Sequence, residues 1–407
     1  MSTLVNVSTA VASGNACVLA VESGGDLPEV HFTPSPMGGP EAMWFCFELT
    51  AATDPPPAGI RCVMHLVDNL LGGGDGRAGF HPVFKTAQQE WTRVAAVEGD
   101  ELPDGRPVVS WTVPGDQGPV CVALCYPYAA AEREALERDL TPAFRSDVVA
   151  VTQENRPLCR LSNDPGQAEA ARPGIYCFAR QHAGETPGSW VLDGLLRAMA
   201  AAGDKAPLVW AVPMVDLDGV LAGQYGKDRY PWDFNRAWGS QRYPQAMLEQ
   251  TGTHAMRYET HCLQNDLLRW KKRCKPLMVL DFHAPAMCEQ DGIYCYVRHL
   301  GEDGRPDAGH RPWVEAFQAA VDGQVAATAF ARTGKYRSRW ETARISDFVN
   351  EALNLPAVTF EVPYACTRQT LLTRESYQHA GQRLAEAIVT RLQADAAACA
   401  PTAAEQP

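Results

Sequence analysis

The 407-residue chain lacks the features that mark membrane and secreted proteins. No run of apolar residues approaches the length of about 18 that a membrane-spanning helix needs. The first twenty residues contain no lysine or arginine, so they lack the positively charged start of a secretory signal peptide. No internal repeat is visible in the sequence. These absences predict a cytoplasmic protein with no membrane association.

Cysteine pairs of the CxxC type are also missing, although the chain has 13 cysteines. Zinc clusters built on cysteine and thiol redox motifs depend on that close spacing. An odd and scattered set of cysteines favours buried, reduced thiols over a framework of disulfides.

Positive charge is scarce, since 36 basic residues face 48 acidic ones and the formal net charge is -12 at pH 7. This balance argues against nucleic acid and anionic membranes as partners, because both attract basic surfaces. The chain is long enough to bury a sizeable core and to form two domains.

Residues 1–150 consist of short apolar runs separated by turn residues. The triple glycine Gly72–Gly74 and the triple proline Pro55–Pro57 break the pattern. The predicted strands are Met43–Thr50, Ile60–Val67, Thr92–Val97, Val108–Val113 and Val120–Tyr126. Short strands at this spacing predict an N-terminal antiparallel β-sandwich domain.

After Arg156 the sequence alternates between strands and amphipathic helices. The predicted helices are Ser189–Ala201, Met247–Lys272, Val314–Ala331 and Glu375–Leu392. The predicted strands are Gly174–Ala179, Leu208–Val212, Met278–Phe282 and Ala357–Val362. This alternation predicts an α/β domain with a mixed sheet over residues 151–393. The alanine-rich residues 394–407 are predicted to form a disordered tail.

Three side chains of metal-binding types follow two of these strands. His182 and Glu185 lie three residues apart just after Gly174–Ala179, and His283 follows Glu185 by 98 residues. Zinc accepts imidazole nitrogen and carboxylate oxygen, and catalytic zinc sites use three protein ligands and one open position. Functional sites of open α/β sheets gather at strand ends. The spacing therefore indicates a candidate metal site.

Each of these features has an ordinary explanation when it is taken alone. An isolated His182 or His283 is more readily a histidine hydrogen-bonded in a loop or at a strand end. Arg236 could simply form an ion pair with Asp233. Glu361 is harder to explain, because an unpaired carboxylate in an apolar strand is costly. The order of these residues along the chain, at strand ends, favours the metal-site interpretation.

Together these segments resemble the zinc metallocarboxypeptidases of the carboxypeptidase A type. More narrowly, the chain resembles the cytosolic carboxypeptidase branch, in which a β-sandwich precedes the catalytic domain. The resemblance covers roughly residues 40–390, and the residues that carry it are Leu124–Tyr128, Ala179–Thr186, Asp233–Arg236 with Trp238, Asp281–His283 and Glu361.

The resemblance implies one zinc ion bound by His182, Glu185 and His283. It implies that Glu361 is the general base, which takes a proton from the attacking water and passes it to the leaving amine. Asp233 would accept the distal N–H of His182 and so fix the tautomer of that ring.

For the substrate, the resemblance implies that Asn235 and Arg236 bind the C-terminal carboxylate, which a planar guanidinium can hold with two hydrogen bonds. The family also uses an arginine to stabilise the oxyanion, but the nearest position here holds a glycine. Arg229 is the substitute candidate, with Lys227 second. Tyr336 is the candidate for the family's mobile substrate-binding tyrosine.

The implied function is hydrolysis of the C-terminal residue of peptides or proteins. The basic stretch Arg332–Arg339, with Arg344, predicts a preference for acidic C-termini, although these residues could equally form a solvated loop paired with nearby acids. Two other functions stay open. One is a related zinc amidohydrolase acting on small acylated amino acids or muropeptides. The other is a non-catalytic peptide-binding module, against which Glu361 argues because a binding module has no use for a base.

Overall fold

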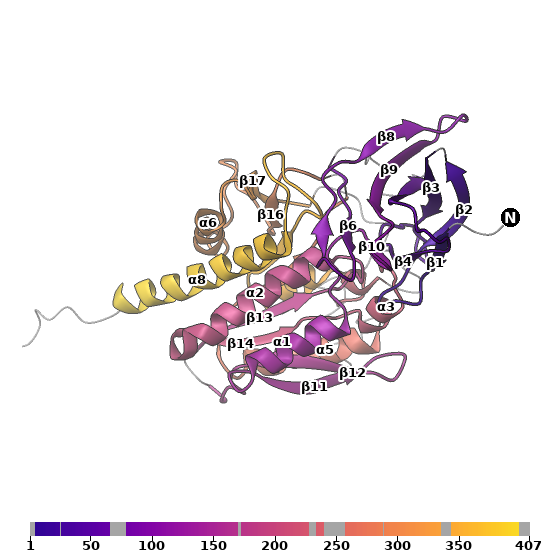
Figure 1. Ribbon diagram of the computed structural model, residues 1–407. Helices are drawn as coiled ribbons and strands as arrows, with labels where there is room; N and C mark the ends of the chain where they lie inside the picture. Colours follow the sequence, from indigo (N-terminus) through magenta and orange to yellow (C-terminus); the bar gives the residue numbers. More distant parts are fainter. Residues whose placement is uncertain are drawn as a thin grey trace, which may run out of the picture.

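The N-terminal part of the chain forms two five-stranded sheets, in a computed structural model that describes residues 5–24, 26–65, 79–169, 172–227, 233–239, 257–287, 289–334 and 343–398. The first sheet has the order β1 (Val5–Ser8), β4 (Cys46–Ala51), β10 (Val120–Ala123), β6 (Val83–Lys85) and β7 (Thr92–Arg93). The second has the order β2 (Cys17–Gly24), β3 (Leu27–Thr33), β5 (Gly59–His65), β9 (Pro107–Pro114) and β8 (Glu98–Glu101). We call these two sheets the sandwich (Figure 1).

Aromatic side chains fill the space between the two sheets. Residues of β3 alternate between buried and partly exposed, as a strand with one face on a core should. Phe32 on β3 lies 4.8 Å from Phe47 on β4, measured between ring centroids, and 5.9 Å from Trp111 on β9. The predicted β-sandwich is therefore confirmed.

The sandwich differs from the prediction in two respects. It is not wholly antiparallel, since β3 pairs with β5 in parallel. The reason is that β4 lies between them in sequence but belongs to the opposite sheet, so the chain crosses over and returns in the same direction. Sequence reasoning also missed β1, β2, β3, β6 and β8; the exposed β8, Glu98–Glu101, has no apolar residue to reveal it.

The described strands after residue 144 form one eight-stranded sheet, which is mixed, as predicted. Its order is β11 (Arg145–Val151), β12 (Pro157–Ser162), β14 (Leu208–Val212), β13 (Pro173–Ala179), β15 (Lys275–His283), β18 (Ala357–Glu361), β16 (Ile293–Tyr296) and β17 (Ala326–Arg332). Strands β14, β13, β15 and β18 run parallel, so their carboxyl ends meet at one edge. The sequence placed a domain boundary at residue 150, and β11 already belongs to this sheet.

Helices cover both faces of the large sheet. Ile175 and Cys177 of β13 belong to the core that includes α2 (Thr186–Ala202) and α8 (Arg374–Ala398), which lie side by side (Figure 1). Tyr176 and Phe178 point to the other core, which includes α5 (Tyr258–Lys271) and the short turns α7 (Ile345–Asp347) and η3 (Phe348–Ala352). A strand buried on both faces reads as a continuous apolar run, which is how β13 was predicted.

One helix prediction was wrong. The segment Val314–Ala331 is not a single helix, because α6 (Arg311–Ala320) ends before a turn and β17 follows. The turn is closed by a hydrogen bond of 2.8 Å from the amide of Val325 to the carbonyl of Asp322. The alanine-rich segment after it pairs with β16, so tertiary pairing overrides its helix propensity.

Three other predictions concern the ends of elements and the cysteines. Residues 247–256 of the predicted helix Met247–Lys272 lie outside the described part, and α5 forms the remainder. Helix α8 continues to Ala398, past the point where the sequence predicted a disordered tail. The eleven cysteines in the described part are free thiols, as predicted, but not all are buried, since Cys17 is exposed and Cys121, Cys159 and Cys262 are partly exposed. Within that part, no helix is long and apolar enough to cross a membrane.

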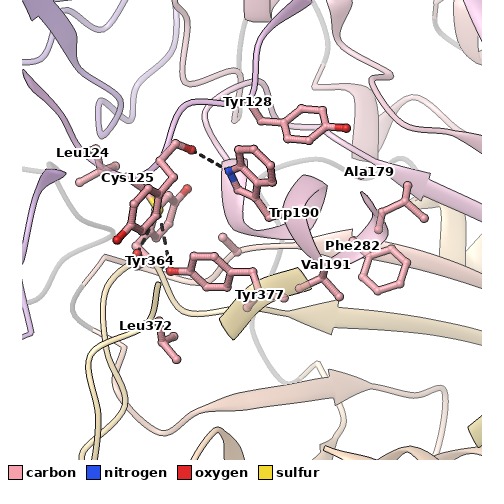
Figure 2. Packing of buried hydrophobic residues seen from close by; sticks show 14 of the residues in the cluster. Leu124, Cys125, Tyr128, Ala179, Trp190, Val191, Phe282, Tyr364, Leu372 and Tyr377 are labelled. Atoms are coloured by element: carbon pink, nitrogen blue, oxygen red, sulfur yellow. Dashed lines mark hydrogen bonds between the residues drawn. The ribbon is translucent and has the colours of Figure 1, made fainter. Parts of the chain in front are cut away.

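The segment after β10 joins the sandwich to the large sheet (Figure 2). The thiol of Cys125 donates to the carbonyl oxygen of Tyr364 at 3.1 Å. The indole of Trp190, on α2, donates to the carbonyl oxygen of Tyr126 at 3.1 Å. The hydroxyl of Tyr128 donates to Asp193 at 3.2 Å. The sandwich is thus hydrogen-bonded to both α2 and the segment that follows β18.

Candidate metal centre

His182, Glu185 and His283 meet at the carboxyl end of the parallel strands. Nδ1 of His182 lies 2.7 Å from one carboxylate oxygen of Glu185, and Nδ1 of His283 lies 2.7 Å from the other. The two Nδ1 atoms are 3.2 Å apart. All three residues are buried. The structure brings together the three side chains that the sequence singled out.

The loop that carries His182 and Glu185 is held in an unusual backbone conformation. Arg180 follows the end of β13 with a φ of 63°, a left-handed conformation that costs free energy in a non-glycine residue. Its buried guanidinium donates to the carbonyl oxygens of Ala183, at 2.8 Å, and Tyr128, at 2.7 Å. These bonds offset the strain and hold the loop closed just before helix α2 begins.

Gly184 lets this loop approach its neighbours. A Cβ atom at this position would lie 2.8 Å from the ring of Tyr225 and 3.0 Å from Cβ of Trp44, too close for any side chain. The amide of Gly184 donates to the carbonyl oxygen of Tyr225 at 2.8 Å. Position 184, directly before Glu185, must therefore be glycine for the loop to lie where it does.

In both histidines, Nε2 points away from the candidate metal centre and contacts a carboxylate. Nε2 of His182 lies 3.1 Å from both oxygens of Asp233. Nε2 of His283 lies 2.8 Å from Asp281, which also accepts a bond of 2.8 Å from the side-chain amide of Gln181. The sequence assigned this orienting role to Asp233 only. Asp281 was missed, although its position two residues before His283 on the same face of β15 could have revealed it.

The electrostatics of the centre favour positive charge between the two Nδ1 atoms. Burial alone would lower the pKa of His182, but Asp233 and Glu185 outweigh it and raise that pKa to about 9. Burial would also lower the pKa of His283. The negative charges of Asp281 and Glu185 outweigh this effect, so the pKa of His283 is well above its ordinary value. Burial would raise the pKa of Glu185, yet the two histidines hold it far below the usual range.

The donor set fits a metal ion. The ligand atoms of His182, Glu185 and His283 all lie within 4.8 Å of one another. Ligand atoms held about 2.1 Å from a tetrahedral ion lie roughly 3.4 Å apart, so small side-chain movements would complete such a site. Buried carboxylates need a cation or hydrogen-bond donors to offset the cost of burial. Both histidines have their outer nitrogen on a carboxylate, the arrangement typical of metal ligands.

Glu361 lies beside the metal donors at the last position of β18, where its register partner on β15 is His283. Its Oε2 atom is buried and has no hydrogen-bond partner among the described residues. Burial, together with the charge of Glu185, raises the pKa of Glu361 to about 7. A carboxylate in this environment is a stronger base than an exposed glutamate.

The substrate-binding candidates line the same pocket, which has a volume of about 390 Å³. Asn235 and Arg236 belong to the short turn η2 (Phe234–Arg236), which begins after Asp233. The side-chain oxygen of Asn235 accepts a bond of 3.0 Å from the amide of Ile345. Both residues are buried and face the pocket together with the metal donors and Glu361.

The remaining candidates are those for stabilising the oxyanion and for contacting the substrate. Arg229 and Tyr336 lie outside the described residues. Lys227, the second oxyanion candidate, lines the pocket. Its ammonium lies 3.5 Å from the carboxylate of Glu41, a residue of the sandwich that sequence reasoning did not consider.

Comparison with known proteins points to one group. No family model matches the sequence. The chain is 25% identical over 233 residues to cytosolic carboxypeptidase 6 of Caenorhabditis elegans, covering 52% of this chain and 49% of that protein. It is 32% identical over 167 residues to cytosolic carboxypeptidase 4 of Mus musculus, covering 35% of this chain and 14% of that protein. The matches thus span about half of the first relative's length and less of the second's.

The fold comparison extends over nearly the whole chain. A metallo-carboxypeptidase of Burkholderia cenocepacia, solved as a crystal structure, has a TM-score of 0.72 at 18% identity, covering 96% of this chain and 99% of that one. The resemblance predicted from the motifs is therefore confirmed: this chain has the fold of the metallo-carboxypeptidases, and its sequence is similar to that of the cytosolic carboxypeptidases.

Proposed function

We propose that this chain is a zinc-dependent metallocarboxypeptidase that hydrolyses the C-terminal residue of peptides or proteins. The observation that supports this most is that one pocket contains the metal donors, the buried carboxylate of Glu361, and the Asn235–Arg236 pair. A metal donor set alone would suit many functions. An adjacent base and a buried guanidinium suit the hydrolysis of a substrate that carries a negative charge next to the scissile bond.

His182, Glu185 and His283 would hold the zinc ion. Two imidazoles and one glutamate leave a fourth position open, as in catalytic zinc sites of other peptidases. When bound, zinc supplies Lewis acidity, which makes water more acidic and polarises a carbonyl group. Asp233 and Asp281 keep the rings of the two histidines oriented, so that Nδ1 of each is presented to the ion.

Glu361 would move the proton. Its Oε2 atom, which is buried without a partner among the described residues, accepts a proton from the attacking water and delivers it to the nitrogen of the leaving amino acid. A group that must both accept and release a proton works best when its pKa lies near the working pH. Burial raises the pKa of Glu361 toward that range.

Asn235 and Arg236 would hold the free carboxylate of the substrate. The backbone amide of Asn235 donates to Asp233 at 2.6 Å, and the guanidinium of Arg236 donates to the carbonyl of Asn235 at 2.8 Å. These bonds attach the turn to the carboxylate that orients His182. The carboxylate clamp is thereby held close to the metal donors, and this would place the last peptide bond of the substrate at the metal centre.

Three finer assignments belong to the same proposal. Arg229, or Lys227 in its place, would stabilise the oxyanion, and Tyr336 would contact the substrate. The basic stretch Arg332–Arg339 with Arg344 would favour acidic C-termini; of these residues Arg344 lines the pocket and pairs with Asp347 at 3.0 Å. The relatives are named cytosolic, and we place this protein in the cytosol as well.

Release of amino acids from a peptide panel tests the proposal. Peptides ending in Glu, Lys, Phe or Ala, each with a free or an amidated C-terminus, should lose one residue only in the free form. Arg236→Ala should raise KM strongly and make the amidated peptides no worse than the free acids. Equal cleavage of both forms by the wild type would instead indicate an endopeptidase or an amidase. Preference for Glu that weakens with salt would support the basic pocket, and a salt-independent preference for Lys or Phe would exclude it.

A further inference from the structure

Glu41 is the one residue of the sandwich among the described residues that line the pocket. It precedes β4 and is 7% exposed. The other lining residues belong to the large sheet and the segments that connect its strands. The sandwich therefore contributes a charged side chain to the same cavity as the metal donors.

Glu41 forms an ion pair with Lys227, which lies on the loop after α3 (Leu217–Leu221). Its ammonium is 3.5 Å from a carboxylate oxygen of Glu41, and 28% of the lysine side chain is exposed. A partly buried ion pair is screened less by water and salt than a surface pair. Lys227 also lines the pocket, so its positive charge is close to Glu361 and the metal donors.

The residues just before Lys227 are held on two sides. On the sandwich side, the side-chain amide of Asn15 donates to the carbonyl oxygen of Gly223 at 2.7 Å. On the other side, Gly226 has a φ of 87°, and a Cβ atom there would lie 2.6 Å from the amide nitrogen of Ala183 in the metal-ligand loop. These contacts hold the residues just before Lys227 against both the sandwich and the metal-ligand loop.

We propose that the sandwich completes the active site: Glu41 is a positioning residue that holds the ammonium of Lys227 at the pocket, where it stabilises the negative charge that develops on the oxygen of the scissile carbonyl. This inference rests on the proposed carboxypeptidase activity. It selects Lys227 for a role for which the sequence favoured Arg229.

A lysine in this role needs a partner. Its flexible four-carbon stem can adopt many rotamers, and an ammonium lacks the rigid fork of an arginine. Glu41 removes part of that freedom before the substrate binds. An ammonium has three N–H donors, so it can contact Glu41 and a substrate oxygen at the same time. Groups aimed in advance at developing charge are usually the largest contribution to catalysis.

Four variants in the zinc-loaded enzyme test the proposal: Lys227→Met, Lys227→Arg, Glu41→Gln and the double variant Glu41→Gln/Lys227→Met. We expect Lys227→Met to lower kcat about 100-fold with little change in KM, the size typical of losing one oxyanion donor. Lys227→Arg should restore most of kcat. Glu41→Gln should lower kcat about 10-fold, and should have no further effect in the Lys227→Met background because it acts through the lysine.

The exposed pair Lys85–Glu90, at 3.3 Å on the sandwich, supplies matched control variants, Lys85→Met and Glu90→Gln, which should leave kcat unchanged. A second measurement separates catalysis from folding. A peptide analogue with a phosphonate in place of the scissile carbonyl should bind Lys227→Met about 100-fold more weakly, whereas a dipeptide product should bind it as it binds the wild type.

Several results would overturn the inference. Effects of Glu41→Gln and Lys227→Met that simply add in the double variant would show that Glu41 does not act through Lys227. Equal losses of phosphonate and product binding would show a merely structural role. A wild-type protein that binds zinc but releases no C-terminal residue would defeat the proposed function itself. An active wild type with unimpaired Lys227→Met would defeat only this inference.

Discussion

The guanidinium of Arg93, on strand β7 of the sandwich, donates a hydrogen bond of 3.0 Å to the carbonyl oxygen of Tyr364, three residues after Glu361. The same buried guanidinium donates to the carbonyl of Leu372 at 2.8 Å. The hydroxyl of Tyr364 in turn lies 3.5 Å from the carbonyl oxygen of Gly184 in the metal-ligand loop. One arginine of the sandwich thus supports the segment between the base and helix α8.

Arg93→Met should destabilise the protein by roughly 3 kcal/mol, because it removes one hydrogen-bond donor from each of the carbonyl oxygens of Leu372, His81 and Tyr364. Urea unfolding of the metal-free protein measures this difference directly. The matched control is Arg106→Met, which removes an exposed arginine of the sandwich that pairs with Asp104 at 2.7 Å. Surface pairs contribute about 0–1 kcal/mol, so that variant should unfold almost like the wild type. Equal effects of the two substitutions would contradict this account of Arg93.

Glu361→Gln should retain zinc and substrate binding while losing turnover, since glutamine cannot accept a proton. Loss of a group that acts in the transition state lowers kcat much more than it changes KM. Metal content and dipeptide affinity serve as controls for folding. A Gln variant that keeps more than about a tenth of wild-type kcat would exclude Glu361 as the base, because general bases contribute about 100-fold or more.

The dependence of activity on pH should also show that an ionised carboxylate acts as the base. Burial and Glu185 raise the pKa of Glu361 to about 7 in the protein alone, and a cation bound at the neighbouring donors would lower it. The base is active when ionised, so kcat/KM should fall as the pH decreases through a value at or below about 7. An activity that stays constant from pH 8 down to pH 4 would mean that no carboxylate of this kind is required.

Asp281→Asn and Asp233→Asn should each weaken zinc affinity by about 10- to 100-fold, because each removes the carboxylate that orients one histidine ligand. Competition with a chelating dye measures the affinity. Asp139→Asn, which alters an exposed aspartate paired with Arg197 at 2.8 Å, is the control. Unchanged affinity in Asp281→Asn would show that the 2.8 Å contact between Asp281 and His283 has no role in metal binding.

The strands that position the site could be predicted because each carries its own pattern. The apolar run before His182 and the strand that ends at Glu361 are buried on both faces, so local sequence alone revealed them. The segment Val314–Ala331 was predicted as one amphipathic helix, and nothing local reveals that its second half pairs with β16. Elements whose structure is decided by distant partners are the ones that sequence reasoning missed.

In the candidate site too, some residues could be predicted from the local sequence and others could not. Residues of metal-binding types at strand ends predicted the three metal donors. The order of these residues along the chain indicated the resemblance to the metallocarboxypeptidases. Glu41 could not be predicted, because it precedes the metal-ligand loop by more than a hundred residues and reaches the pocket only through the packing of the sandwich. Asp281 was within reach, since residues two apart on a strand share a face.

Zinc content and C-terminal release, measured together on the wild type and on His182→Ala, test the central claim most directly. The control is His310→Ala, which removes another buried histidine, held by Asp307 at 2.9 Å outside the pocket. The account predicts about one zinc ion per wild-type chain with release of single C-terminal residues, loss of both in His182→Ala, and retention of both in His310→Ala. A correctly folded wild-type protein that binds no zinc, or a His182→Ala protein that still releases C-terminal residues at the wild-type rate, would contradict it.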